Sequence, residues 1–290
     1  MKQIHQQVAS EYSEALDESD HARGALARTG SGSFADYAAE DLKHLPGHAV
    51  EASFGCGNPL AFSSVQPGQT VLDLGCGAGL DLLLAAEKVG PKGIVIGVDM
   101  TDAMLEKAQT NIKASRLTNI QVRKGHVETL PVESSSIDWV VSNCVINLSP
   151  EKDKVFAEIA RVLKPGGRMV VSDMIAEALP WWVRRSGLFP ASCGGGAISE
   201  ASYLAGLRGA GLDDCQILAR QYYEPHQMAS VAAGVLPEYL QRATFRGKPI
   251  AIDLIANLAK PIAKKIWSAR IAARKPASAG AGVGPAYPVC

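Results

Sequence analysis

The sequence predicts an α/β fold built around a doubly wound, mostly parallel β-sheet. Short apolar runs alternate with longer amphipathic stretches from about residue 70 to residue 223. Glycine and proline breaks separate these stretches, and polar residues follow several of the apolar runs. Repeated strand–helix units form parallel sheets, because each helix returns the chain to the same end of the sheet. Ligands of such sheets bind outside the carboxyl ends of the strands, so the polar residues there are the candidate site.

The elements follow from the apolar pattern and its breaks. Strands are expected at residues 70–74, 93–98, 120–123, 137–142, 168–172 and 215–223. Helices are expected at residues 80–89, 101–115, 150–163 and 200–210. Gly90-Pro91 ends the first helix, and Thr101 suits the N-cap of the second.

The chain divides by composition into four segments. They are a polar, weakly helical segment at 1–51, the main domain at 52–225, a helical appendage at 226–275 and a disordered tail at 276–290. The appendage is expected to be helical because apolar residues between Leu254 and Ile266 recur at near-helical spacing, with lysines between them and further positive charges up to Lys275. The tail is rich in proline, glycine and alanine.

Composition indicates an ordinary globular protein. Lysine and arginine number 29, as do aspartate and glutamate, so the formal net charge is zero, and this argues against a nucleic-acid partner. The apolar run at residues 137–148 is broken well short of a membrane span, and residues 1–20 have no apolar core of a secretory signal. We therefore expect a soluble, cytoplasmic protein without a membrane partner.

The six cysteines are spread along the chain. They are Cys56, Cys76, Cys144, Cys193, Cys215 and Cys290. None forms a CxxC pair, which argues against a zinc ribbon, and a chain of this size needs no disulfide framework. In a reducing compartment we expect the thiols to be free.

The strongest motif is the glycine-rich turn after the first predicted strand, Val71-Leu-Asp-Leu-Gly-Cys-Gly-Ala-Gly79. Glycines let a ligand approach the backbone closely. A dinucleotide fingerprint would require glycine at position 80, where this chain has Leu80. The carboxylate of Asp73 would repel a pyrophosphate but suits a cation. S-adenosylmethionine carries an ammonium and a sulfonium and has no phosphate, so it fits this turn.

Three further strand ends carry polar residues in the matching order. Asp99 follows the second strand, where a carboxylate can accept both ribose hydroxyls, and Met100 can pack on an adenine ring. Val127 and Glu128 follow the third strand, where they can bind the adenine edge. Asn143 ends the fourth strand and is expected to face the methyl group.

Residues 65–223 resemble the class I S-adenosylmethionine-dependent methyltransferases, whose fold is Rossmann-like. The resemblance rests on these four strand ends and on the Lys-Pro-Gly-Gly turn at residues 164–167. It implies principal cofactor contacts at Asp73, Gly75, Gly77 and Asp99. It implies secondary contacts at Met100, Val127, Glu128 and Asn143.

Three cysteine segments are similar to those of arsenite methyltransferases. They are residues 53–59, 142–149 and 192–197. The resemblance implies that Cys56 and Cys193 bind a trivalent arsenical as substrate, with cellular thiols such as glutathione taking part. Soft thiolates suit arsenic, whose lone pair needs no general base. The cysteine matching Cys144 is not among the ligands that the family implies.

The chain also departs from that family. Many members carry a cysteine upstream of the one matching Cys56 and another in the C-terminal region; here no cysteine precedes Cys56, and none lies between Cys215 and Cys290. Two thiolates would still hold methylarsenite. Three alternatives remain. The first is a methyltransferase for a small organic metabolite, with Trp181 and Trp182 lining an apolar pocket. The others are a non-enzymatic metalloid-binding protein and a zinc site at the cysteines.

Overall fold

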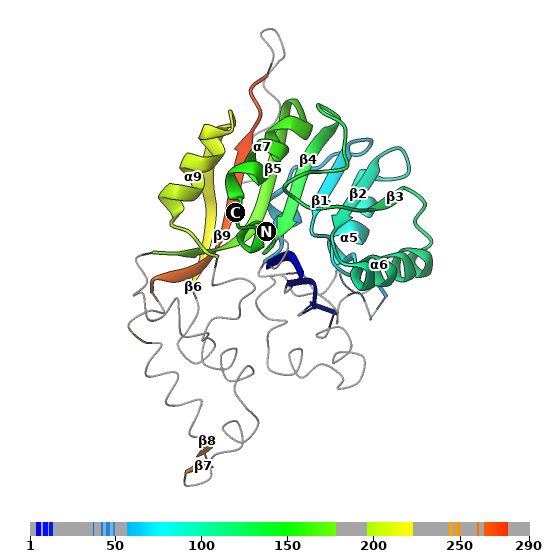
Figure 1. The fold of residues 1–290 in the computed structure, drawn as a ribbon. Helices are drawn as coiled ribbons and strands as arrows, with labels where there is room; N and C mark the ends of the chain where they lie inside the picture. The colour runs from blue at the N-terminus through cyan, green and yellow to red at the C-terminus, as the bar shows by residue number, and fades with distance from the viewer. Residues whose placement is uncertain are drawn as a thin grey trace.

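The computed structural model describes residues 57–177, 196–222 and 264–277, together with 4–6, 8–10, 12–13, 37, 42, 45–46, 49, 244–245, 248–249 and 260. A seven-stranded sheet runs through the described part, with helices on both of its faces (Figure 1). No helix of the described residues is long and apolar enough to cross a membrane.

The strands of the main sheet follow the order β3-β2-β1-β4-β5-β9-β6. They are β1 (Thr70–Leu74), β2 (Ile94–Asp99), β3 (Ile120–Lys124), β4 (Ile137–Asn143), β5 (Leu163–Ala176), β6 (Asp213–Tyr222) and β9 (Ile266–Arg274). A separate antiparallel pair joins β7 (Thr244–Phe245) and β8 (Lys248–Pro249). Strands β1 to β5 pair in parallel, whereas β9 is antiparallel to both of its neighbours. The predicted doubly wound, mostly parallel sheet is therefore confirmed.

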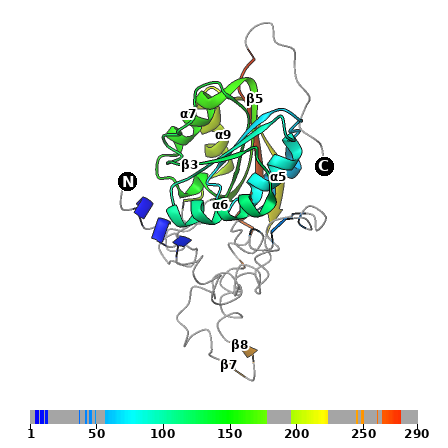
Figure 2. The ribbon, with the colours of Figure 1, turned by 90° about the vertical axis from the view of Figure 1, so that its right-hand side faces the viewer.

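The helices also lie where the sequence predicts them. They are α5 (Leu80–Val89), α6 (Asp102–Ser115), α7 (Lys152–Val162) and α9 (Glu200–Gly209), with short 3-10 helices η2 (Pro59–Phe62) and η3 (Ile146–Leu148). Viewed along the edge of the sheet, α5 and α6 lie on one face, and α7 and α9 on the other (Figure 2). Each face buries its own apolar cluster, in which residues of β1 and β2 contribute to both layers.

Strand β5 begins five residues before the expected position. Leu163 already pairs with Ile137, and a register shift follows before the regular ladder with β4. The Lys-Pro-Gly-Gly segment lies inside this strand, where the N–H of Gly166 donates to the carbonyl of Lys275 at 3.0 Å. The predicted turn is therefore tied to the end of β9, a partner that the local sequence does not reveal.

The helical prediction for residues 226–275 is wrong at its C-terminal part. Ile266–Arg274 forms β9, and eight of its nine residues are buried. The strand lies between β5 and β6 with both faces covered, so its apolar residues do not alternate with polar ones and the strand period is hidden. Residues 266–274 therefore belong to the sheet of the main domain, while residues 226–243 and 250–259 and most of the predicted tail lie outside the described residues.

Arg270 shows why the positive charges of this segment do not indicate a helix with an exposed polar face. The sequence prediction places Arg270 among the positive charges of a helical appendage, yet its side chain is fully buried in β9. Its Nη2 donates to Oε1 of Gln221 at 2.9 Å, and its Nη1 donates to Oγ of Ser268 at 3.2 Å. Polar partners on β9 itself and on the neighbouring β6 thus make burial of the guanidinium possible.

Candidate functional site

A cavity opens at the carboxyl ends of β1, β2 and β4. All eight residues predicted to contact the cofactor line it: Asp73, Gly75, Gly77, Asp99, Met100, Val127, Glu128 and Asn143. Its empty space of about 1000 Å³ includes open solvent at the mouth. The structure therefore brings all eight predicted residues together around one cavity.

The glycine-rich turn leaves room that a side chain would fill. Gly75 has φ +66°, and a Cβ built on it would lie 2.4 Å from Cγ2 of Val145. Its N–H donates to the carbonyl of Val98 at 2.8 Å, which ties the turn to β2. Gly77 also has a positive φ, +50°. Only glycine combines this backbone with such close packing at position 75, so the turn is fixed in shape and open toward the cavity.

Three carboxylates face the same cavity. Burial raises the pKa of Asp73 well above its usual range, and the nearby Asp81 and Asp99 raise it further. Burial also raises the pKa of Asp81 to about 6 and raises that of Asp99. A cation placed among them would offset their repulsion, whereas a phosphate would add to it. The chain's own residues therefore fit S-adenosylmethionine, with its ammonium and sulfonium.

The backbone holds Asp99 in a fixed orientation. Oδ2 accepts from the N–H of Gly77 at 3.0 Å, and Oδ1 accepts from the N–H of Thr101 at 2.9 Å. These bonds lower the pKa of Asp99 and partly oppose the effect of burial. A carboxylate oxygen can accept more than one hydrogen bond, so both atoms can still accept from ligand hydroxyls.

Asp81 is a site residue that the sequence analysis missed. It lies in the first turn of α5, where an acidic residue usually means no more than a favourable helix dipole. Here the hydroxyl of Tyr37 donates to its Oδ1 at 2.8 Å, and Nδ2 of Asn143 lies 3.5 Å from its Oδ2. The Asn143 amide also donates to the carbonyl of Gly57 at 2.5 Å. Asn143 therefore links three segments as well as lining the cavity.

The N-terminal segment contributes one wall of the cavity. His5, Val8 and Tyr12 line it, and their spacing of three and four residues places them on one face of a helix. Val8 is buried, and Tyr12 packs against the apolar pair of Ala78 and Met104. The sequence predicted a polar, weakly helical segment here. It did not single out His5, Val8 and Tyr12, because three such residues do not stand out among the polar and charged residues around them.

The two predicted arsenic ligands, Cys56 and Cys193, lie outside the described residues. Cys144 follows β4 with φ +61°, is buried and is disulfide-bonded. Cys76 and Cys215 are free, so neither is its partner. The expectation that every thiol is free is therefore wrong for Cys144. Burial raises the pKa of Cys76 well above its usual range, so this cavity residue stays a protonated thiol.

Gly57 is next to Cys56 in sequence, and Gly196 comes three residues after Cys193. Both glycines pack near the end of β4. Gly57 lies against β5, since a Cβ on it would come within 2.7 Å of Oγ of Ser172. A Cβ on Gly196 would lie 1.9 Å from the carbonyl oxygen of Asn147. The N–H of Cys144 donates to the carbonyl of Ser172 at 2.8 Å. Both anchors therefore lie beside the segment that carries Cys144.

Comparison with known proteins agrees with this geometry. A methyltransferase domain model matches residues 66–207. An arsenite methyltransferase of Halobacterium salinarum is 41% identical over 218 residues, which cover 75% of this chain and 56% of that protein. The arsenite methyltransferase of Mus musculus is 32% identical over 68% of this chain and 54% of its own length. The chain thus spans a little over half the length of these relatives.

A solved structure covers more of the chain. An arsenic(III) S-adenosylmethionine methyltransferase from Chlamydomonas reinhardtii superimposes with a TM-score of 0.64 and 32% identity, covering 83% of this chain and 73% of that one. The fold and the cavity define the class I S-adenosylmethionine-dependent methyltransferases. Within that class, the chain belongs to the arsenite methyltransferase family.

Proposed function

We propose that this chain transfers the methyl group of S-adenosylmethionine to trivalent arsenic, as arsenite or methylarsenite, held by the thiolates of Cys56 and Cys193. The observation that carries the proposal is the gathering of three cysteine segments at the end of β4. Gly57, next to Cys56, accepts a hydrogen bond from Asn143, and Gly196, three residues after Cys193, contacts Asn147. Asn143 and Asn147 flank Cys144.

Covalent geometry limits how far the two cysteines can lie from these anchors. One residue spans about 3.8 Å between Cα atoms, and three residues span at most about 11 Å. The disulfide at Cys144 supports the same view, because it requires a second cysteine sulfur of this chain at bonding distance from this buried position. Convergence of thiols is what a soft trivalent arsenical needs, since two or three sulfur ligands hold it.

The residues of the cavity would orient the cofactor rather than supply a base. When bound, S-adenosylmethionine would supply an electrophilic methyl group: the lone pair on arsenic forms the As–C bond as the S–CH3 bond breaks and S-adenosylhomocysteine leaves, and a cellular thiol such as glutathione would reduce the pentavalent product. Asp73, Asp81 and Asp99 provide negative charge along the wall on which the cationic groups would lie. The thiolates would hold the acceptor in line, and positioning of this kind accounts for much of the catalysis in such transfers.

Methylarsenite is the acceptor that the cysteine content favours. Only two thiols correspond to the family's ligands, and an arsenical that already carries one methyl group has two positions left for sulfur. A cellular thiol such as glutathione would supply a third ligand for arsenite and would reduce the disulfide at Cys144. We therefore expect faster methylation of methylarsenite than of arsenite.

The test is a product assay with labelled cofactor. Purified protein is incubated with labelled S-adenosylmethionine, glutathione and either arsenite, methylarsenite or a metabolite pool. We expect label in a methylated arsenical. Cys215→Ser is the matched control, because this thiol is free and its sulfur lies against the carbonyl of Leu212 rather than in the cavity. Label found only in an organic product would replace arsenic as the acceptor, and arsenical binding without transfer would favour a non-enzymatic role.

A further inference from the structure

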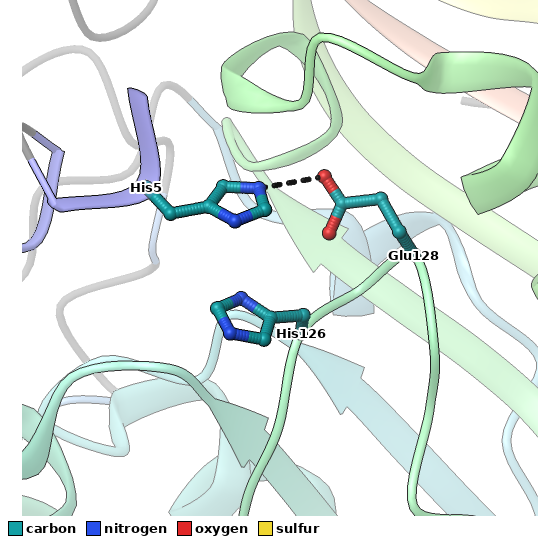
Figure 3. Close-up of side chains that lie close together, drawn as sticks. All are labelled: His5, His126 and Glu128. Carbon is teal, nitrogen blue, oxygen red and sulfur yellow. Dashed lines mark hydrogen bonds and ion pairs between the residues drawn. The ribbon is translucent and has the colours of Figure 1, made fainter. Parts of the chain in front are cut away.

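Two histidines and a carboxylate meet beside the cofactor cavity, which His5 and Glu128 line. Nε2 of His5 lies 3.1 Å from Oε1 of Glu128, although 123 residues separate them in sequence. The imidazole rings of His5 and His126 are stacked, with centroids 4.5 Å apart. Figure 3 shows the two rings one above the other, with the Glu128 carboxylate reaching toward them from the opposite side.

The donor set suits a transition-metal ion. Imidazole nitrogen and carboxylate oxygen are common ligands of Zn²⁺, Co²⁺ and Ni²⁺, and three protein ligands leave a position for water. The candidate ligand atoms of these three residues all lie within 4.8 Å of one another. A shared ion with bonds of about 2.1 Å needs them within about 4.2 Å, so small rotations of the side chains bring all three into reach.

The surroundings already orient the carboxylate. Oγ of Ser149 donates to Oε1 of Glu128 at 2.5 Å. A hydrogen bond from a neighbouring side chain is the usual support of a metal-ligating carboxylate. The side chains of His5 and Glu128 are 18% and 8% exposed, so little water competes for their ligand atoms. His126 is exposed and leaves the site accessible to an incoming ion.

We propose that His5, His126 and Glu128 bind one divalent transition-metal ion, Zn²⁺ being the best match, and that the ion clamps the N-terminal segment across the cofactor cavity. His5 comes from the wall that also carries Val8 and Tyr12. His126 and Glu128 come from the loop after β3, on another wall. An ion bonded to both walls opposes their separation, so the cofactor enters and leaves more slowly while the ion is bound. This inference does not depend on the identity of the methyl acceptor.

The first experiment measures binding of Co²⁺ and Zn²⁺ without interference from thiols. A variant carrying Cys56→Ser, Cys144→Ser and Cys193→Ser is titrated with each ion by calorimetry, and the visible spectrum of Co²⁺ is recorded. We expect one ion per chain, with ligand-field bands and no sulfur charge-transfer band. His126→Ala should weaken binding at least about tenfold, or about 1.4 kcal/mol. Asp102→Asn is the matched control, because this exposed carboxylate pairs with the exposed ammonium of Lys124.

If the triple variant does not fold, the same titration is carried out on the wild-type protein and on His126→Ala. Wild type should then bind one more Co²⁺ than His126→Ala, and the extra ion should add no sulfur charge transfer. Equal stoichiometry and affinity in the two proteins would overturn the metal site and leave only the hydrogen bond between His5 and Glu128.

The second experiment tests the clamp through the exchange of the cofactor. Bound S-adenosylmethionine is chased with S-adenosylhomocysteine, with and without Zn²⁺, and no arsenical is present. We expect Zn²⁺ to slow dissociation at least about threefold in wild type, about 0.7 kcal/mol, and to leave His126→Ala unchanged. Equal slowing in both proteins, or none in wild type, would overturn the clamp. A failed methylation assay would leave both results intact, so the two proposals fail separately.

Discussion

The cofactor side of the cavity and the proposed acceptor side beside it are built in different ways. On the cofactor side, Asp73, Asp99 and Asn143 come from the ends of β1, β2 and β4, within about 70 residues of chain. On the proposed acceptor side, Gly57, Cys144, Ser172 and Gly196 come from segments spread over 140 residues. A compact stretch of chain therefore encodes the cofactor cavity, whereas the proposed acceptor side depends on contacts between distant segments.

The two sides also differ in chemistry. The cofactor side carries hard carboxylates, and burial keeps the thiol of Cys76 protonated there. On the acceptor side, the disulfide at Cys144 shows that two sulfurs can meet. Charge would therefore select the cofactor, and soft thiolates would select the acceptor. Each of the following predictions separates these two roles.

The largest effect is expected from the two thiols assigned to the acceptor. Cys56→Ser or Cys193→Ser should lower arsenical methylation at least about a hundredfold, because one remaining thiolate cannot chelate, and loss of one strong ligand bond costs about 3 kcal/mol or more. Affinity for S-adenosylmethionine, measured by calorimetry, should stay unchanged. If cofactor affinity falls together with activity, the two sides of the cavity are not separable.

On the cofactor side, Asp99→Ala should weaken S-adenosylmethionine binding about tenfold to a hundredfold. Each lost hydrogen bond to a charged group is worth about 1.5–3 kcal/mol. Calorimetric titration measures the change, and Asp102→Ala serves as the control because that carboxylate is 70% exposed. Unchanged affinity in Asp99→Ala would remove this residue from the site.

A buried carboxyl on the acceptor side should make stability depend on pH. Asp173 accepts from Asn147 at 2.7 Å and from the hydroxyl of Tyr203 at 3.2 Å, with the Lys152 ammonium nearby. Burial raises its pKa from 3.8 to about 7, and it also lowers the pKa of Lys152, so desolvation outweighs their attraction.

At pH values between 3.8 and about 7, the Asp173 carboxyl keeps its proton in the folded state but has lost it in the unfolded state. The free energy of unfolding should therefore fall as the pH rises from 3.8 toward about 7. The slope from one such group is at most about 1.4 kcal/mol per pH unit. Asp173→Asn should remove this part of the slope in urea denaturation. A slope identical in both proteins would show that Asp173 is ionised in the fold.

A smaller effect is expected at Cys144. Under reducing conditions, Cys144→Ser should keep methylation within about twofold of wild type, a change of about 0.4 kcal/mol, because the family resemblance gives this thiol no ligand role. Product formation with methylarsenite and glutathione measures it. A loss as large as that in Cys56→Ser would instead show a three-thiolate site that includes Cys144.

The smallest effect is expected from truncation after Pro276. The carbonyl and N–H of Lys275 still bond to Gly166 and Gly167, so the end of β9 remains anchored. Methylation and cofactor affinity should stay near wild-type values. A large loss with the arsenical, but not in cofactor binding, would show that Cys290 takes part on the acceptor side.

Most of the described fold could be predicted because its signals are local. The strands and helices from β1 to β6 alternate within short stretches, and each apolar run ends in glycine, proline or a polar residue. Strand β9 could not be predicted in this way. It is buried on both faces and reads IWSARIAAR, so it has no alternation, and its partners β5 and β6 lie far away in sequence.

From the sequence alone, the parallel sheet, the glycine-rich turn and the gathering of the eight predicted cofactor residues could be predicted, because strand ends in consecutive βαβ units meet at one edge of the sheet. Tertiary packing alone reveals that Asp81 lines the cavity and accepts a hydrogen bond from Tyr37, that His5 meets Glu128 and that Arg270 is buried. Each of these contacts joins residues more than 40 positions apart, and it depends on how layers pack rather than on the local pattern of the chain.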